Sequence, residues 1–371
     1  MLAKMRLKDV LYERTIPAAR ELAVAAEESA VRCVACGHRC LIRDGKAGIC
    51  RVRFNCGGEL RVPGGYVAGL QVDPIEKKPF YHAYPGRDAL SFGMLGCDFH
   101  CGYCQNWVTS QALRDDEAVA LPRTCSAEEL VSLAIRHDAP VVVSTYNEPL
   151  ITSEWAVTVF EKAREHGIEC GYVSNGNATP EVLAYIRPFV SLYKVDLKSF
   201  DDKQYRKLGG VLKNVLDAIV RLKEMEFWVE IVTLVVPGFN DSDGELCAIA
   251  RFIAGVSRDI PWHVTAFHPD YKMAGPPRTT IHELERAYTA GKEAGLRYVY
   301  PGNLPGLAGD RENTCCPTCG ATLIHRHGFT VIDNRMNGSA CGECGAAIPG
   351  VWEQHAPKRS VGSGIPRAVR L

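Results

Sequence analysis

Short apolar segments alternate with longer amphipathic segments through the middle of the chain. The short segments are rich in β-branched residues, as in PVVVSTYNEP (140–149) and WVEIVTLVVPG (228–238). Segments that stay apolar along their whole length are typical of parallel strands covered by helices. We predict strands at 89–95, 140–149, 169–176, 191–199, 228–238, 261–269 and 296–303. Between them we predict helices near 126–138, 152–166, 179–187, 211–226, 242–254 and 280–295.

Six or seven strand–helix units are too many for a small open sheet and one short of a closed eight-fold barrel. We therefore predict an α/β fold with a partial, open (β/α)6 barrel over residues 87–310. In such folds the chemistry lies at the carboxyl ends of the strands. Polar clusters follow the predicted strands in this way: YNEP, SNGN, DLK, PGFND, FHPD and PGN.

Two cysteine-rich blocks flank the predicted barrel. The N-terminal block, residues 1–86, has an amphipathic helical start and then short strand-like pieces such as ELRVPGGYVAGLQV. The C-terminal block, residues 311–355, carries paired CxxC turns. The remaining residues, 356–371, are basic and contain glycine and proline, which predicts a flexible tail.

Charge and hydropathy exclude several classes of protein. Lys plus Arg and Asp plus Glu both number 43, so the net charge of zero argues against a general nucleic-acid binder. No stretch approaches 18 uninterrupted apolar residues, so we expect no membrane span. The first 30 residues show no apolar core and no cleavage site, so we expect no signal peptide and a cytoplasmic location.

The chain has 16 cysteines, and most of them are clustered. Cytoplasmic thiols stay reduced, so clusters of them indicate metal sites rather than disulfides. Three isolated cysteines are better explained as small buried apolar residues, namely Cys125, Cys170 and Cys247. The clustered ones are Cys33, Cys36, Cys40, Cys50 and Cys56, then Cys97, Cys101 and Cys104, and finally Cys315, Cys316, Cys319, Cys341 and Cys344.

The central cluster lies in GCDFHCGYCQNW (96–107), the loop that follows the first predicted strand. Cys97, Cys101 and Cys104 have the spacing C-x3-C-x2-C and no fourth cysteine nearby. Three thiolates can hold three corners of a [4Fe–4S] cluster and leave one iron open, and an open position distinguishes a catalytic metal from a structural one. Tyr103 would supply an aromatic wall. A structural zinc loop and incidental cysteines are the alternatives.

The motif CDFHCGYC at this position resembles the signature of radical S-adenosylmethionine (SAM) enzymes. The resemblance extends over almost the whole chain, up to about residue 356. Within this class, the sequence is similar to the radical enzyme of the AmmeMemoRadiSam system, a relative of pyruvate formate-lyase activating enzymes. The further matching motifs are CQNW, STYNEP, VSNG, VDLK, VVPGFND, FHPDYKM, YVYPGN, NTCCPTCG and CGECG.

The resemblance implies a radical SAM barrel and a reductive chemistry. The open iron would bind the amino and carboxylate groups of SAM. An electron donor such as flavodoxin or ferredoxin would supply one electron, and SAM would split into methionine and a 5′-deoxyadenosyl radical. That radical would abstract hydrogen from a substrate. The cluster and SAM carry the chemistry, while the barrel orients the reactants and excludes water.

The resemblance also implies roles for the strand-end residues. Asn147 and Glu148 would accept hydrogen bonds from the methionine amine, although Tyr146 and Asn147 replace two glycines of the related motif. Val173 stands where activating enzymes have an acidic cation ligand, so no such cation is implied. The remaining residues would contact the carboxylate, ribose, adenine or substrate, or would simply be polar residues of a barrel rim: Ser174, Asn175, Asp196, Lys198, Val236 and His268.

The terminal cysteine clusters predict two closed, four-thiolate sites. The C-terminal pairs, Cys316 with Cys319 and Cys341 with Cys344, have the spacing of a structural zinc ribbon. The N-terminal spacing is C-x2-C-x3-C-x9-C, for which zinc is the simpler interpretation. A second iron–sulfur cluster that relays electrons is the alternative there. The N-terminal ligands would be Cys33, Cys36, Cys40 and Cys50.

Three functions remain open for the whole chain. It could be a radical SAM enzyme, a non-catalytic iron–sulfur electron carrier, or a zinc-ribbon scaffold on a degenerate barrel. As an enzyme it could activate a glycyl radical protein partner, or act on a small molecule or a modified nucleoside. The name of the resembling system implies association with Memo-type and AMMECR-type proteins.

Overall fold

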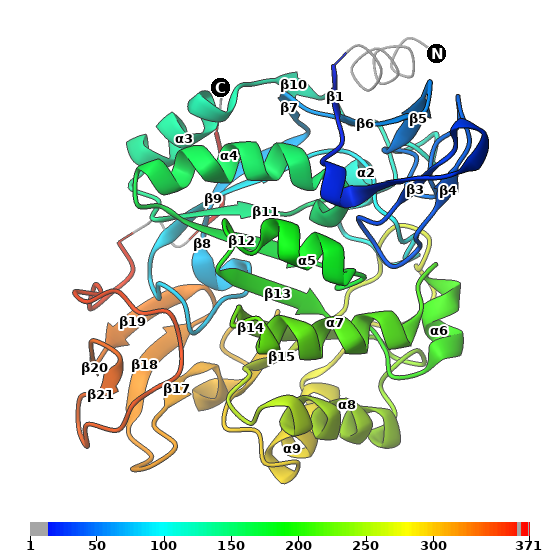
Figure 1. Ribbon diagram of the computed structural model, residues 1–371. Coiled ribbons are helices and arrows are strands. Elements are labelled where there is room, and N and C mark those ends of the chain that lie inside the picture. The colour runs from blue at the N-terminus through cyan, green and yellow to red at the C-terminus, as the bar shows by residue number, and fades with distance from the viewer. Residues whose placement is uncertain (1–13, 362–364, 370) are drawn as a thin grey trace.

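A computed structural model describes residues 14–361, 365–369 and 371. Its centre is a nine-stranded sheet in which seven neighbouring strands run parallel (Figure 1). The parallel strands follow chain order across the sheet, and each predicted strand is confirmed. They are β9 (Asp88–Gly93), β11 (Val141–Ser144), β12 (Glu169–Ser174), β13 (Leu192–Asp196), β14 (Trp228–Val235), β15 (Trp262–Ala266) and β16 (Val299–Gly302).

Helices connect the parallel strands, and all six predicted helices are present. Two of these helices begin with capping boxes, at Ser126 and Thr280. In each box the backbone N–H of the cap residue donates to a carboxylate three residues later, that of Glu129 or Glu283. Right-handed crossovers between neighbouring strands place their helices on one face of a sheet. The crossover helices are α2 (Trp107–Ser110), α3 (Ala127–Arg136), α4 (Ser153–Glu165), α5 (Pro180–Ile186), α6 (Asp202–Lys207), α7 (Leu212–Glu224), α8 (Asp243–Val256) and α9 (Ile281–Glu293).

Two antiparallel strands extend the sheet beyond β9. Strand β8 (Gly69–Pro74) pairs with β9, and β22 (Arg367–Ala368) pairs with β8. The main sheet therefore begins inside the block that the sequence assigned to the N-terminal domain. The described part of the predicted flexible tail is docked, because it forms β22 and Arg367 pairs with Asp88 at 2.8 Å.

The N-terminal block forms two small antiparallel sheets beside the loop that follows β9. One contains β1 (Thr15–Pro17), β6 (Glu59–Pro63) and β5 (Phe54–Cys56). The other contains β2 (Ala23–Ala25), β3 (Val31–Cys33) and β4 (Leu41–Ile42). A further pair joins β7 (Tyr66–Val67) to β10 (Arg123–Thr124). The predicted helical start falls largely on residues 1–13, outside the described residues.

Two ion pairs fasten this N-terminal block to the crossover helices. Arg53 forms a bidentate pair with Glu154 of α4, at 2.6 and 2.7 Å, and both side chains are buried. Arg39 forms a similar pair with Glu181 of α5, at 2.7 and 2.8 Å, but both of those side chains are exposed to solvent. The block is therefore held against the barrel at one buried and one exposed position.

The C-terminal block packs at the β16 edge of the sheet, where Tyr298 and Tyr300 share an apolar cluster with Leu323 and Ile324. It contains β17 (Thr314–Cys315), β18 (Thr322–His327) and β19 (Thr330–Asn334) in one sheet, and β20 (Met336–Asn337) with β21 (Ala340–Cys341) in another. Figure 1 shows β17 to β21 on the side of the molecule away from β1 to β6. Arg326 is buried and donates to the carbonyl oxygen of Tyr81 at 2.7 Å. This contact joins the block to the segment before β9.

Among the described residues, none of the helices has the length and apolar character that a membrane crossing requires.

Candidate active site

The face of the sheet opposite the crossover helices lines a cavity of about 630 Å³. Strand residues from β8 and from β12 to β16 reach this cavity, together with the loops that follow β9 and β11. Strands from both ends of the sheet share the cavity, so the sheet curves around it. The volume lies within the range of small-molecule binding sites.

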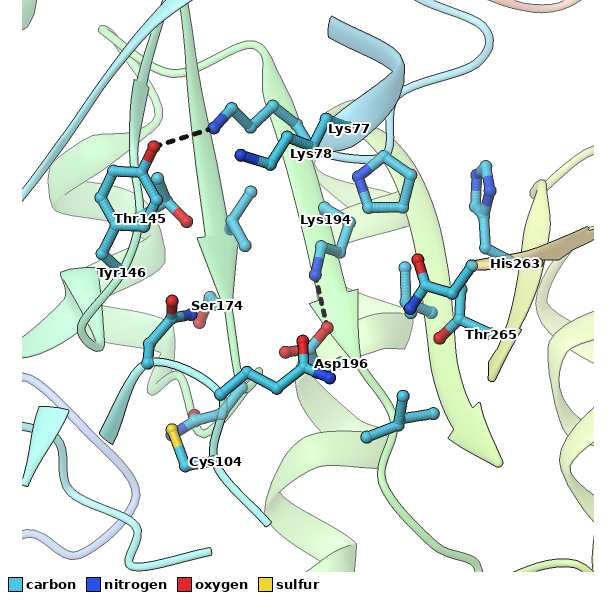
Figure 2. A pocket seen from close by; sticks show the side chains of 18 of the residues that line it. Lys77, Lys78, Cys104, Thr145, Tyr146, Ser174, Lys194, Asp196, His263 and Thr265 are labelled. Carbon is cyan, nitrogen blue, oxygen red and sulfur yellow. Dashed lines mark hydrogen bonds and ion pairs between the residues drawn. The ribbon is translucent and has the colours of Figure 1, made fainter. Parts of the chain in front are cut away.

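All three cysteines of the C-x3-C-x2-C loop line this cavity. The loop leaves β9 through Gly96, whose φ of +92° suits glycine, and a Cβ there would lie 2.4 Å from Val52 of the N-terminal block. Figure 2 shows Cys104 at one end of the pocket and Lys77 and Lys78 at the other. The two ends therefore carry different chemistry.

Hydrogen bonds shape the cysteine loop and reach its sulfur atoms. Arg114 donates from Nη1 to the carbonyl oxygens of Cys97, at 2.6 Å, and Phe99, at 2.9 Å. The backbone N–H of Phe99 donates to the sulfur of Cys97 at 3.3 Å, and the Ser110 hydroxyl lies 3.2 Å from the sulfur of Cys104. Such donors tune metal-bound thiolates, so the donor set fits an iron–sulfur cluster.

Asp98 connects the cysteine loop to the end of β12, and the sequence analysis missed it. Its side chain is fully buried and accepts hydrogen bonds from the amides of Asn175, at 2.7 Å, and Asn177, at 2.8 Å. His38 of the N-terminal cysteine block lies 3.9 Å from the same carboxylate. No periodicity marks a single aspartate inside a cysteine loop, so sequence reasoning had no signal for it.

Asn147 and Glu148, the residues predicted to bind the methionine amine, follow β11 and form hydrogen bonds with residues at the ends of β9 and β12. Glu148 accepts hydrogen bonds from the Ser174 hydroxyl at 2.7 Å and from the Asn175 N–H at 2.8 Å. Burial, followed by the nearby Asp98 carboxylate, raises the pKa of Glu148 to about 8. Asn147 accepts from the Met94 N–H at 2.9 Å. These polar atoms line the cavity, but each has a partner within the protein.

The motif that STYNEP resembles has a glycine at the position of Tyr146, and the backbone of Tyr146 adopts a conformation typical of glycine. Its φ of +69° lies in the left-handed region that glycine adopts freely. The hydroxyl of Tyr146 donates to Asp73 at 2.8 Å. Its side chain lies against Gly69 and Gly93, where an added Cβ would lie 2.8 Å from a ring carbon and from the Cβ of Tyr146, respectively. Tertiary contacts therefore hold a conformation that the side chain alone disfavours.

Strand β13 and the loop that follows it present three charged residues to the cavity, Lys194, Asp196 and Lys198. Asp196 pairs with Lys194 and, at 3.4 Å, with Lys198. Burial alone would raise the pKa of Asp196, but the two lysines outweigh burial and lower it. Lys194 was missed by the sequence analysis, although the alternation of charged residues in YKVDLK marks positions 194, 196 and 198 as one face of a strand.

The far end of the cavity contains a cluster that the sequence analysis also missed. Asp73 is fully buried behind the cavity wall and pairs with both Lys77, at 2.9 Å, and Lys78. Gln71 accepts from Lys77 at 3.3 Å and from the Tyr146 hydroxyl at 3.2 Å. Burial lowers the pKa of Lys78 to about 8. Lys77 ends a short 3-10 helix, η3 (Ile75–Lys77), and Lys78 follows it directly, outside any periodic segment.

Two of the predicted contact residues do not line the cavity. Val236 is fully buried, and Val232 and Leu234 of β14 reach the cavity instead. His268 is exposed at the rim, where its Nδ1 lies 3.1 Å from the side-chain amide of Gln105. Tyr103 lines the cavity.

Below the strand ends, a buried carboxylate organises the base of the cavity. Glu230 of β14 lies 2.6 Å from His263 Nε2 and accepts from the N–H groups of Tyr81, at 3.0 Å, and His82, at 2.9 Å. Burial, helped by Lys194, lowers the pKa of His263 despite this partner. Glu230 therefore joins β14, β15 and the segment before β9.

The two terminal cysteine groups differ in spacing. Among the described residues, one group of potential metal ligands has all its ligand atoms within 4.8 Å of one another, and it is the C-terminal group. There the sulfur of Cys316 lies 3.7 Å from that of Cys344, and the sulfur of Cys319 lies 3.7 Å from that of Cys341. The N-terminal thiols do not converge this closely. They belong to Cys33, Cys36, Cys40 and Cys50.

Comparison with known proteins identifies the class of this site. A family model described as the radical SAM superfamily matches residues 93–250. An uncharacterised protein of Methanocaldococcus jannaschii, MJ0808, is 38% identical over 327 residues, which cover 87% of this chain and 96% of that protein. The chain belongs to the radical SAM superfamily of enzymes. Membership implies a [4Fe–4S] cluster and SAM.

More distant relatives are activating enzymes. The pyruvate formate-lyase-activating enzyme of Staphylococcus aureus (strain USA300) is 27% identical over 246 residues, which cover 60% of this chain and 92% of that enzyme. A solved radical SAM methyltransferase from Sphaerobacter thermophilus is 18% identical, with a TM-score of 0.44, covering 59% of this chain and 68% of that one.

Proposed function

We propose that this enzyme cleaves SAM reductively at a [4Fe–4S] cluster held by Cys97, Cys101 and Cys104 inside a partial (β/α)6 barrel. The observation that carries the proposal is that all three thiols line the same cavity as the polar strand ends. Among the described residues, these thiols do not group as closely as single-ion ligands, which suits thiolates bound to separate irons. When bound, a cluster held by these thiolates would supply the single electron needed to break a C–S bond of SAM, which yields methionine and a 5′-deoxyadenosyl radical.

The walls of the cavity supply the groups that would orient SAM. Asn175, Asp196 and Lys198 border the cysteine end, and Tyr103 covers one side of it. Glu148 accepts hydrogen bonds from Ser174 and from the backbone of Asn175, which fixes the position of Asn175 at the end of β12. Val236 and His268 are not part of this proposal, because neither lines the cavity.

The finer features of the proposal rest on the sequence motifs. We place the chain in the AmmeMemoRadiSam group, with a low-potential donor such as flavodoxin or ferredoxin and with Memo-type and AMMECR-type proteins as associates. A cytoplasmic location accords with its 16 free cysteines.

A second candidate function is the activation of a glycyl radical enzyme. The relationship to pyruvate formate-lyase-activating enzymes favours it. In that case the radical would abstract hydrogen from a glycine of a protein partner. Both candidates share the same SAM chemistry and differ in the substrate that enters the cavity.

The C-terminal thiols are proposed to bind zinc. A tetrahedral zinc with bonds of about 2.3 Å places its sulfur ligands about 3.8 Å apart. The sulfur pairs at 3.7 Å match that spacing. The wider N-terminal group accords less well with a single ion, so a second iron–sulfur cluster is the stronger alternative there.

Metal analysis tests these assignments together. Anaerobically purified enzyme is expected to hold about four irons from the cysteine loop, and one zinc from the C-terminal site. A total of about eight irons would assign the N-terminal thiols to a second cluster, and a second zinc would assign them to zinc. Iron absent from protein prepared and reconstituted without oxygen would contradict the proposed function.

Lys198→Ala is expected to keep the iron–sulfur spectrum yet bind SAM poorly. Lys198 lines the cavity beside Asp196 and is not a metal ligand. Hydrogen bonds to charged groups contribute roughly 1.5–3 kcal/mol, so affinity should fall by about one to two powers of ten. Isothermal titration calorimetry, with SAM added to the anaerobic enzyme, measures the affinity. Lys203→Ala, at an exposed position of α6, is the control, and equal affinity in both variants would remove Lys198 from the site.

A further inference from the structure

The end of the cavity opposite the cysteine loop carries more positive than negative charge. Lys77 and Lys78 share the single carboxylate of Asp73. Across the cavity, Lys194 and Lys198 share the single carboxylate of Asp196. Each pair of ammonium groups therefore has one carboxylate to neutralise it.

The other acidic residues near this end have their own partners. Glu76 lies 3.6 Å from the guanidinium of buried Arg326, and Glu230 lies 2.6 Å from His263. Glu312 accepts hydrogen bonds from the N–H groups of Gly306, at 3.1 Å, and Gly328, at 2.7 Å. The carboxylate that contacts Lys77 and Lys78 is that of Asp73, so this pair of lysines keeps one positive charge that its own contacts do not neutralise.

The three lysines line one shared cavity rather than separate surfaces. Figure 2 shows Lys77 and Lys78 together at one end of the pocket, and Lys194 between them and Asp196, with its ammonium group turned toward Asp196. Lys77 and Lys194 also lower the pKa of Lys78, which burial already lowers, as expected for neighbouring ammonium groups. Buried like charges that face one another in a cavity are stabilised by a bound counter-charge.

We propose that Lys77, Lys78 and Lys194 bind an anionic group, a carboxylate or a phosphate, of a small-molecule substrate. This inference rests on the proposed function, in which SAM occupies the cysteine end and its own carboxylate binds there. The cavity size favours a small molecule over a protein segment, because SAM and the substrate share about 630 Å³. The tip between β18 and β19, with Gly328 and Phe329, also lines the cavity.

Anion binding to the SAM-saturated anaerobic holoenzyme tests the site. Inorganic phosphate and succinate are titrated separately by calorimetry, with the carboxylate subsite of SAM already filled. We expect saturable binding of at least one of them, and a charge-assisted hydrogen bond lost in Lys77→Met or Lys194→Met should weaken it about 10- to 100-fold. Phosphate alone would indicate a phosphorylated substrate, and succinate alone a carboxylate.

Both variants leave each carboxylate with a cation, since Lys78 remains on Asp73 and Lys198 on Asp196. The control is Lys213→Met, at an exposed position of α7, which should bind the anion like wild type. No saturable binding of either anion, or affinities unchanged in both variants, would overturn the inference and favour a protein substrate. An equal loss of SAM affinity in Lys77→Met would assign the lysines to SAM and also overturn it.

Failure of this inference and failure of the proposed function are distinguishable. Absence of 5′-deoxyadenosine from the wild-type enzyme would contradict SAM cleavage, whereas anion affinity is measured without turnover.

Discussion

Replacing Cys97, Cys101 and Cys104 together by alanine is expected to abolish the cluster at the cavity and all SAM cleavage. These three thiols are the cysteines that line the cavity among the described residues, so no other thiol is in place to substitute for them. The visible absorption and the electron paramagnetic resonance signal that respond to SAM should disappear. Iron analysis should show a loss of about four irons per chain.

The terminal sites provide an internal control for this variant. Cys316 and Cys341 pack in a different apolar cluster from the one that contains Cys101, so the zinc proposed for the C-terminal thiols should remain. Retention of full iron content by the triple variant would place the cluster elsewhere. Loss of both zinc and iron would indicate that the whole chain had failed to fold, and single Cys→Ser variants would then separate the two effects.

Arg53→Met is expected to lower the free energy of unfolding by about 3–5 kcal/mol. Both Arg53 and Glu154 are buried, at 1% and 5% side-chain exposure, so losing the arginine leaves a buried carboxylate without its charged partner. The pair also holds the N-terminal block against α4, next to the loop that carries the cysteines. Urea denaturation of the anaerobic holoenzyme measures the change.

Arg39→Met is the matched control, because Arg39 and Glu181 form the same bidentate geometry between the same two parts of the chain. Their side chains are 40% and 37% exposed, and an exposed pair contributes about 0–1 kcal/mol. Equal losses of stability in the two variants would contradict the role of burial. Because the two ion pairs share this geometry and connect the same two parts of the chain, the difference in stability between the two variants measures the effect of burial.

The parallel part of the sheet could be predicted from the sequence because each strand is a local apolar run. Strand β9 is buried at every residue, and β11 likewise, so both appear as continuous apolar segments. The antiparallel extension could not be predicted in the same way. Strand β22 has two residues and its partner β8 lies almost 300 positions earlier, so the pairing depends on tertiary contacts rather than local pattern.

The residues of the candidate site likewise differ in whether a local pattern in the sequence could predict them. The cysteine loop is a local motif, and its position after the first strand was predictable. Lys77 and Lys78 stand at the end of a 3-10 helix and just after it. The place of this helix in the cavity depends on long-range contacts, such as that of Glu76 with Arg326, 250 residues later. Val236 was placed in the site from motif order alone, and the strand ends one residue before it.

The most direct test of radical SAM chemistry is the amount of 5′-deoxyadenosine formed by anaerobic, cluster-loaded enzyme with dithionite and SAM. Liquid chromatography with mass spectrometry quantifies the product over time. The wild-type enzyme is predicted to form 5′-deoxyadenosine and methionine in equal amounts, and the triple cysteine variant to form neither above the level without protein. Wild-type enzyme with a full cluster and no 5′-deoxyadenosine, or equal product from the triple variant, would contradict the account.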